Sequence, residues 1–264
     1  QVHGAVMNIN RGNPAGHEVL VDSWPQFKAV ITRPCREVAS DNSDFYTNMY
    51  AAFPDLGAYQ ALLGSAGAIN WSQTFCIYGL QDGVYKTSRD IAKDKGLQLE
   101  AYKYFTYLHP EPSTMPEIRD MTALRPPALV GRDSTMRLSF LDISHTNLLN
   151  ETWPYGGTKQ SWQYLANLVL YFPSFCLLNA SSHPVSWSLL DPFGAMVHGY
   201  TLPQYRGRGY MQVVITETAK QMHAQGYPIY DLVEPENQPI QKLQESQGFQ
   251  RQPSLSHCLI HTPG

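Results

Sequence analysis

The residues with the clearest chemical meaning form the stretch Gln204-Tyr205-Arg206-Gly207-Arg208-Gly209, between a strand-like run and a helix-like run. In such a strand–turn–helix unit, the first N–H groups of the helix point back toward the strand end and favour an anion. Gly207 and Gly209 lack a Cβ, so the backbone can approach a phosphate closely. Arg206 and Arg208 add positive charge beside it. The pattern therefore favours a pyrophosphate as ligand.

The spacing of this loop can be compared with that of two nucleotide-binding motifs and of a simple turn. A P-loop requires GxxxxGK[ST], and neither that spacing nor its lysine is present. A dinucleotide-binding fingerprint requires a third small residue where Gln212 stands, although Asp231 lies at a suitable distance. A tight turn rich in glycine and arginine, without a ligand, stays open as an alternative because short motifs arise by chance.

The strand and the helix that would position the loop follow from hydrophobic periodicity. Residues 195–202 are predicted as a strand. Residues 210–225 are predicted as a helix that ends at Gly226, with an apolar face of Met211, Val214, Ile215, Thr218 and Met222. The other elements predicted in this half are strands at 136–143, 174–178, 185–190, 229–233 and 255–260, and helices at 147–150, 160–171 and 239–247. Their order predicts a mixed sheet with helices on both faces, in an α/β (α+β) fold.

A proline-rich seam precedes this half of the chain. Residues 108–133 contain charged residues and five prolines, Pro110, Pro112, Pro116, Pro126 and Pro127. Prolines at that density disfavour both helix and central strand. Before the seam, short strand-like and helix-like runs alternate. We therefore predict two domains, residues 1–132 with the linker at its end and residues 133–264.

The bulk composition argues against several classes of protein. Of the 264 residues, 43% are apolar and 16% are charged, which is typical of a globular chain. The net charge of −3 gives no basic excess for nucleic acid. The most apolar stretch, residues 165–178, is interrupted by Asn167 and Pro173, so we expect no membrane span. The sequence begins with Gln1, and any targeting peptide would lie before it.

Cysteine and histidine spacing predicts no metal centre. The cysteines are far apart without a CxxC pair, so we expect four free thiols in a reducing compartment: Cys35, Cys76, Cys176 and Cys258. His257 and His261 fall in a strand-like run, which would separate them by about 13 Å. Four convergent ligands are not evident there.

Two segments together resemble the GCN5-related N-acyltransferase (GNAT) superfamily. Gln204-x-x-Gly207-x-Gly209, after a strand and before a long helix, is similar to the acyl-CoA loop of these enzymes. About 30 residues later, Asn237 follows the next strand, and a short helix ends in Gly248-Phe249. This is similar to the second cofactor segment, which flanks the pantetheine arm.

Further segments resemble the glycine N-acyltransferase family, with its glycine N-acyltransferase-like branch, over nearly the whole chain. They include Ser23-Trp24-Pro25-Gln26-Phe27, Pro184-Val185-Ser186-Trp187-Ser188 and His198-Gly199-Tyr200-Thr201-Leu202-Pro203. The resemblance implies a degenerate GNAT-like N-terminal half and a GNAT domain that binds acyl-CoA. It implies transfer of an acyl group to the amine of glycine or glutamine, without a metal. It also implies a mitochondrial location, or otherwise a cytoplasmic one, and specifies no oligomeric state.

The resemblance assigns the site residues as follows. The backbone around Leu202 faces the thioester, and Asn237 contacts the pantetheine arm. A turn at residues 153–157 faces the acceptor. The residues around the pyrophosphate are Gln204, Arg206, Gly207, Arg208, Gly209, Tyr210 and Met211.

The expected acid and base are where this sequence departs from the family. In glycine N-acyltransferase a Glu serves as the general base, and the corresponding residue here is Ala195. Many GNAT enzymes have a Tyr as the general acid, and the corresponding residue here is Gln244, which cannot protonate a thiolate. His198 is the candidate base, because its ordinary pKa of ~6.5 suits proton abstraction. Strand alternation turns it away from the face of Ala195, so a shared role requires a bulge. A packed structural histidine is the alternative, and a catalytically impaired CoA-binding paralogue is the corresponding alternative function.

Overall fold

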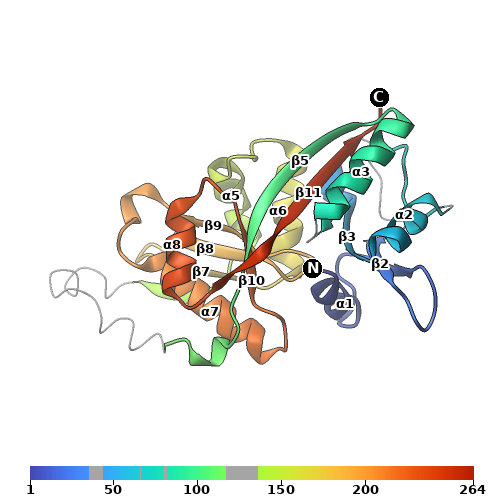
Figure 1. Cartoon of the computed structure of the whole chain (residues 1–264). Coiled ribbons are helices and arrows are strands. Elements are labelled where there is room, and N and C mark those ends of the chain that lie inside the picture. The colour runs from blue at the N-terminus through green and yellow to red at the C-terminus, as the bar shows by residue number, and fades with distance from the viewer. Residues whose placement is uncertain (36–43, 66, 80–81, 117–135) are drawn as a thin grey trace. The chain divides into compact units, whose positions relative to one another are not determined.

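The computed structural model describes residues 1–35, 44–65, 67–79, 82–116 and 136–264 (Figure 1). Contacts divide the chain into two compact units. The first unit comprises Gln1–Thr106, Leu232–Asn237 and Arg251–Gly264, and the second comprises Tyr107–Asp231 and Gln238–Gln250. The C-terminal segment therefore belongs by its contacts to the first unit. The domain boundary predicted at residues 132 and 133, and the seam from residue 117 onward, lie outside the described residues.

In the residues that the structure describes, the first unit contains a mixed set of strands and three α-helices. In spatial order the strands are β1 (His17–Val21), β2 (Ala29–Pro34), β3 (Met49–Pro54), β4 (Phe75–Gly79), β11 (Gln250–Thr262) and β5 (Gln98–Leu108). The helices are α1 (Val2–Ile9), α2 (Leu56–Gly64) and α3 (Asp82–Lys95). β3 and β4 run parallel, whereas β2 and β11 are antiparallel to their neighbours β3 and β4.

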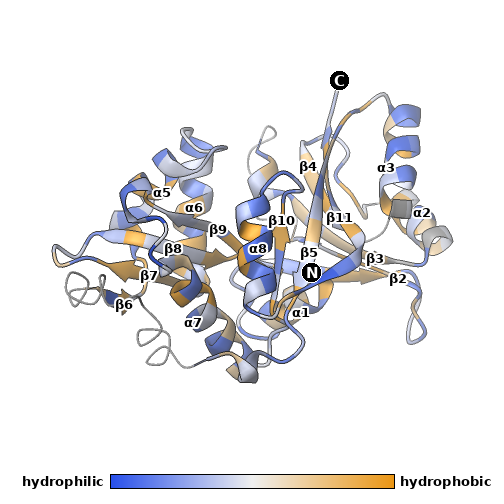
Figure 2. Cartoon of the chain, turned by 60° about the vertical axis from the view of Figure 1, so that its left-hand side comes forward, coloured by the Kyte–Doolittle hydropathy of each residue, from blue (hydrophilic) through white to orange (hydrophobic). Residues whose placement is uncertain are grey.

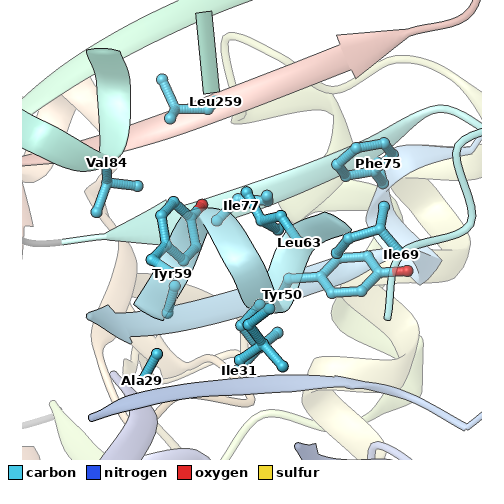
Figure 3. Close-up of a cluster of buried hydrophobic side chains, with 12 residues drawn as sticks. Ala29, Ile31, Tyr50, Tyr59, Leu63, Ile69, Phe75, Ile77, Val84 and Leu259 are labelled. Carbon is cyan, nitrogen blue, oxygen red and sulfur yellow. The ribbon is translucent and has the colours of Figure 1, made fainter. Parts of the chain in front are cut away.

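The core of the first unit forms where α2 covers alternate strand residues (Figure 3). Tyr59, Leu62 and Leu63 recur at helical spacing, so one face of α2 is apolar. Ile31 of β2 and Ile77 of β4 lie beneath this face and are fully buried. Each buried side chain of this size contributes about 1.5–3 kcal/mol of transfer free energy.

Among the described residues, the strands of the second unit are, in spatial order, β6 (Arg137–Ser139), β7 (Ser174–Leu178), β8 (Pro184–Leu190), β9 (Met196–Thr201) and the first half of β10 (Tyr230–Val233), whose last two residues belong to the first unit. Neighbours from β6 to β9 are antiparallel, and β9 and β10 are parallel, with Asp231 opposite Met196. The helices are α5 (Thr146–Thr152), α6 (Lys159–Tyr171), α7 (Tyr210–Ala224) and α8 (Gln238–Ser246). This is the mixed sheet with flanking helices that the sequence predicts.

Helices α6 and α7 lie on opposite faces of β7 and β8 (Figure 2). Phe175 and Leu177 of β7 pack against the start of α7. Trp187, on the other face of β8, lines a pocket together with Leu165 of α6. Both faces of these strands are therefore buried, which explains why β7 and β8 are apolar almost throughout.

Most predicted elements of the second half are confirmed, including the helix at 210–225 and the strand at 195–202. The strand predicted at 136–143 is wrong in length, because β6 covers only Arg137–Ser139. The Asp142 carboxylate accepts a hydrogen bond from the Ser144 N–H at 2.8 Å and caps a 3-10 turn, which ends the extended run. None of the described helices is long and apolar enough to cross a bilayer.

Candidate functional site

The glycine loop connects the end of β9 to the first turn of α7. After a 3-10 turn at Pro203–Tyr205, Gly207 and Gly209 adopt φ of +73° and +77°. A Cβ atom built at either position meets no other atom within 4 Å, so the loop is open on the side where these hydrogens lie. Both φ values fall in the left-handed region, which explains why glycine occupies both positions.

Helix α7 presents its N-terminal amides next to this open loop. Its first helical hydrogen bond joins the Val213 N–H to the Gly209 carbonyl at 3.2 Å. The N–H groups of Tyr210, Met211 and Gln212 precede that bond and have no helical carbonyl four residues earlier. These donors and the helix dipole favour an anion at the start of α7.

The two arginines of the loop fix its shape through backbone carbonyls. The Arg206 Nε donates to the Thr201 carbonyl at 3.0 Å, and its guanidinium lies 5.3 Å from the Tyr200 ring centroid. An Arg208 terminal nitrogen donates to the Gln204 carbonyl at 3.2 Å. Since Arg206 is exposed and Arg208 half-buried, positive charge is retained beside the open glycines. Gln204 therefore contributes its carbonyl to the loop itself.

Tyr210 and Met211 differ in what they offer a ligand. The Tyr210 side chain is buried in the cluster with Phe175 and Val214, so only its backbone faces the loop end of the helix. The Met211 sulfur lies 3.6 Å from where a Cβ on Gly199 would stand. The first turn of α7 is thus packed against the irregular part of β9.

Strand β9 is irregular at His198, where a catalytic role for this residue requires a bulge. Its pairing with β8 shifts register between Trp187 and Leu189, and His198 adopts φ of +55°. Two residues of β9, His198 and Gly199, stand opposite one residue of β8. This is a β-bulge, which redirects a side chain from simple alternation. The bulge that a role for His198 requires is therefore present.

The His198 ring lies in an aromatic pocket of about 50 Å³. Its Nε2 is 3.2 Å from the Tyr164 hydroxyl, and its ring meets Trp153 edge-on with centroids 4.6 Å apart. Burial among these groups lowers the pKa of His198 to about 4. The sequence expectation of an ordinary pKa is therefore wrong, because the apolar surroundings disfavour the imidazolium. Leu149, Leu165, Trp187 and Tyr200 complete the apolar wall of the pocket.

Trp153 brings the turn at residues 153–157 to this pocket. The turn is tight, since the Gly156 N–H donates to the Trp153 carbonyl at 2.9 Å and the Gly157 N–H to the Asn150 Oδ1 at 3.0 Å. Tyr164, whose hydroxyl lies beside the His198 ring, is a residue that the sequence reasoning misses. Its one signal in the sequence is a position on the helix that follows this turn, directly before the core residue Leu165.

Ala195 closes a turn that a buried carboxylate organises. The Asp191 Oδ1 accepts hydrogen bonds from the N–H of Phe193 at 2.9 Å and of Ala195 at 2.8 Å. Burial raises the pKa of Asp191 to about 6, although these backbone donors oppose the shift. The Asp191 carboxylate therefore stabilises the turn that precedes β9. Ala195 itself is fully buried.

Gln244 and Leu202 both have structural hydrogen bonds. The Gln244 amide nitrogen donates to the Asp231 carboxylate at 2.6 Å, and the side chain is fully buried. The Leu202 N–H donates to the Val185 carbonyl at 2.9 Å, so this amide belongs to the sheet. Successive residues of an antiparallel ladder turn their N–H groups alternately toward and away from the partner. The neighbouring Thr201 N–H therefore points away from β8.

Asn237 lies between β10 and α8, and its N–H donates to the Glu234 carbonyl at 3.0 Å. By its contacts it belongs to the first unit. Its contact with a pantetheine arm stays a prediction. For metals, the described residues contain no group of three or more His, Cys, Asp or Glu side chains that could hold an ion.

Comparison with protein families matches both parts of the chain. Residues 1–173 match a family model described as aralkyl acyl-CoA:amino acid N-acyltransferase, and residues 175–263 match the model of its C-terminal region. The chain is 34% identical to a bovine glycine N-acyltransferase, covering 96% of this chain and 88% of that protein. It is 33% identical to a mouse glycine N-acyltransferase-like protein, covering 100% and 87%.

Solved structures show the same fold. An X-ray structure of a Drosophila protein superimposes with a TM-score of 0.71 at 15% identity, over 94% of this chain and 80% of that one. A GCN5-related N-acetyltransferase from Kribbella flavida gives a TM-score of 0.53 at 10% identity, over 99% and 96%. The predicted GNAT-type fold is therefore confirmed.

Proposed function

Because this chain belongs to the aralkyl acyl-CoA:amino acid N-acyltransferase family, we propose that it transfers an acyl group from acyl-CoA to the amine of glycine or glutamine. The observation that carries this proposal is the open glycine loop at the start of α7, within a chain matched along nearly its whole length by that family. Glycine is taken from the names of the relatives, and glutamine from the family resemblance.

The pyrophosphate of acyl-CoA is proposed to bind at Gly207–Met211. Arg206 and Arg208 supply charge, and the first α7 amides supply donors. The first unit contains the same strand–helix–strand order in β3, α2 and β4, which allows a comparison. There, the Asp55 carboxylate accepts from the N–H groups of Gly57 and Ala58 and caps its own helix. An anion is thus already supplied at α2, whereas Gly209 leaves the start of α7 without such a side-chain cap.

An acyl thioester is proposed to lie along the irregular end of β9, next to the glycine loop. The Thr201 N–H, which points away from β8, is the donor proposed for the thioester carbonyl. We therefore propose the Thr201 N–H, rather than that of Leu202, as the donor, because the Leu202 N–H is already bonded to the Val185 carbonyl.

His198 is proposed to accept the proton of the attacking amine. Its lowered pKa keeps the ring neutral at pH 7, so one ring nitrogen has a lone pair, although a weakly basic one. The Tyr164 hydroxyl near Nε2 orients the ring. The reaction replaces the C–S bond of the thioester by a C–N bond, and the departing thiolate takes its proton from solvent, since Gln244 cannot supply one.

A CoA-binding paralogue with impaired catalysis is the second candidate. Ala195 and Gln244 support it, since one is a buried methyl group and the other is bonded to Asp231. The two candidates differ in turnover. Phenylacetyl-, benzoyl- or oleoyl-CoA is incubated with glycine or glutamine, and free thiol is followed. Acceptor-dependent release supports the enzyme. Binding without acceptor-dependent release supports the paralogue.

A mitochondrial location is also proposed, on the family resemblance alone. Fractionation of cells that express the natural full-length protein tests it, and recovery in the cytosolic fraction would contradict it.

A further inference from the structure

The sulfur atoms of Cys76 and Cys258 lie 2.8 Å apart inside the first unit. Cys76 is on β4 and Cys258 is on β11, and the two strands pair antiparallel. Cys76 stands opposite Ile260 and Cys258 opposite Tyr78, so the two cysteines are diagonal neighbours on one face. Their separation is shorter than the roughly 3.5–4.0 Å at which non-bonded carbon atoms pack. A disulfide needs about 2.05 Å, so the bond requires the two sulfur atoms, and with them the two strands, to move closer.

The pair is enclosed by the sheet. Cys76 is fully buried and Cys258 is 5% exposed, and each strand has a second neighbour, β3 beside β4 and β5 beside β11. Burial raises the pKa of the Cys76 thiol well above its ordinary value. Since both side chains are buried and the thiolate is the nucleophile in thiol–disulfide exchange, the folded pair is protected from a small disulfide. Oxidation therefore requires that β11 is not yet docked on β4, as during folding.

We propose that Cys76 and Cys258 are a dithiol site, oxidised by a low-molecular-weight disulfide to an intramolecular disulfide while β11 docks on β4. One cysteine thiolate attacks the small disulfide, forming a mixed disulfide and releasing one small thiolate. The second cysteine thiolate then attacks the protein sulfur and releases the other. The two protein thiols lose two electrons and two protons, and the small disulfide takes them up as two thiols.

The bond would fasten the last strand of the chain to a strand 182 positions earlier. Most of β11 lies in the segment Arg251–Gly264, which belongs to the first unit but follows all of the second unit in the sequence. Closing a loop of this length restricts the unfolded chain strongly. We expect an increase in Tm of about 5–10 °C for the oxidised protein.

The other cysteines provide the matched controls. Cys35 is half-buried at the end of β2, and Cys176 is buried in β7 of the second unit, where burial raises its pKa to about 12. The Cys35→Ser/Cys176→Ala double variant should keep the cross-link. The Cys76→Ala and Cys258→Ala variants should each lose it, and one of them suffices if the other does not fold.

The experiment refolds the full chain from denaturant in a mixture of oxidised and reduced glutathione, and in parallel with excess reductant. Non-reducing peptide mapping should find a single cross-link between Cys76 and Cys258, with a mass lower by two hydrogens. The Tm should increase in the oxidised sample and return to the lower value after reduction. Cross-links to Cys35 or Cys176, glutathione adducts alone, or an unchanged Tm would each overturn the proposal.

Discussion

Replacing Asp191 by asparagine should remove a specific pH dependence from the stability of the second unit. Asp191 is buried at the turn before β9, and its Oδ1 accepts from the N–H groups of Phe193 and Ala195. Asparagine keeps a carbonyl oxygen that can accept both bonds, but it does not ionise. The substitution therefore separates the charge of this side chain from its hydrogen bonds.

The magnitude follows from the shifted pKa. Burial raises the pKa of Asp191 from 3.8 to about 6, so the folded state holds the proton more tightly than the unfolded state. The stabilisation is fully present below pH 3.8 and is lost as the pH rises through 6. A shift of about two units corresponds to about 3 kcal/mol. The free energy of unfolding of Asp191→Asn minus that of the natural protein should thus increase by about 2.5 kcal/mol between about pH 4 and pH 7, and by about 3 kcal/mol over the whole titration.

Urea unfolding at several pH values, followed by tryptophan fluorescence, measures this difference. Trp153, Trp162 and Trp187 all report on the second unit. The matched control is Asp142→Asn, because the hydrogen bond from the Ser144 hydroxyl lowers the pKa of the exposed Asp142 below 3.8. Its difference should decrease as the pH rises, mainly below about pH 4, and change little between about pH 4 and pH 7. A pH-independent difference for Asp191→Asn would refute the reasoning.

Two further predictions concern the aromatic pocket and the turn beside it. Tyr164→Phe removes the hydroxyl that lies 3.2 Å from the Nε2 of His198. Loss of this hydrogen bond, worth about 1 kcal/mol, should lower kcat/KM about fivefold and displace the pH–rate profile. Unchanged kinetics would contradict a positioning role for Tyr164. Gly156→Ala places a Cβ against the Asn150 carbonyl and should lower Tm by several degrees. Gly64→Ala is its control, since a Cβ there meets nothing within 4 Å and its φ is not in the left-handed region; an equal change in Tm from both would show that the contact is unimportant.

Much of the second unit is predictable because its signals are local. The helix of α7 has an apolar face at helical spacing, and Gly226 stops it. β7 and β8 are apolar because both of their faces are buried. By contrast, β11 extends from Gln250 to Thr262, beyond the run predicted at 255–260. Pairing with strands that are distant in the sequence keeps its polar residues in the extended conformation. The local sequence pattern carries no information about such partners.

The candidate site likewise contains features that the local sequence predicts and features that depend on distant contacts. The glycines of the loop are predictable, since a positive φ favours a residue without a Cβ. The pKa of His198 is not, because it depends on Trp153 and Tyr164, which lie 45 and 34 positions earlier in the sequence. The hydrogen bond of Leu202 to Val185 is likewise set by strand register. Contacts between distant segments therefore decide the chemistry that residue types only suggest.

Calorimetric titration with CoA tests the central claim that the loop after β9 is the acyl-CoA site. The variant is Gly209→Glu, which places a negative charge in the open loop. Its control is Gly96→Glu, where φ is +69° and a Cβ also meets nothing within 4 Å, so backbone strain and charge are matched. We expect the natural protein and Gly96→Glu to bind CoA alike, and Gly209→Glu to lose binding. Unchanged affinity in folded Gly209→Glu would contradict the account.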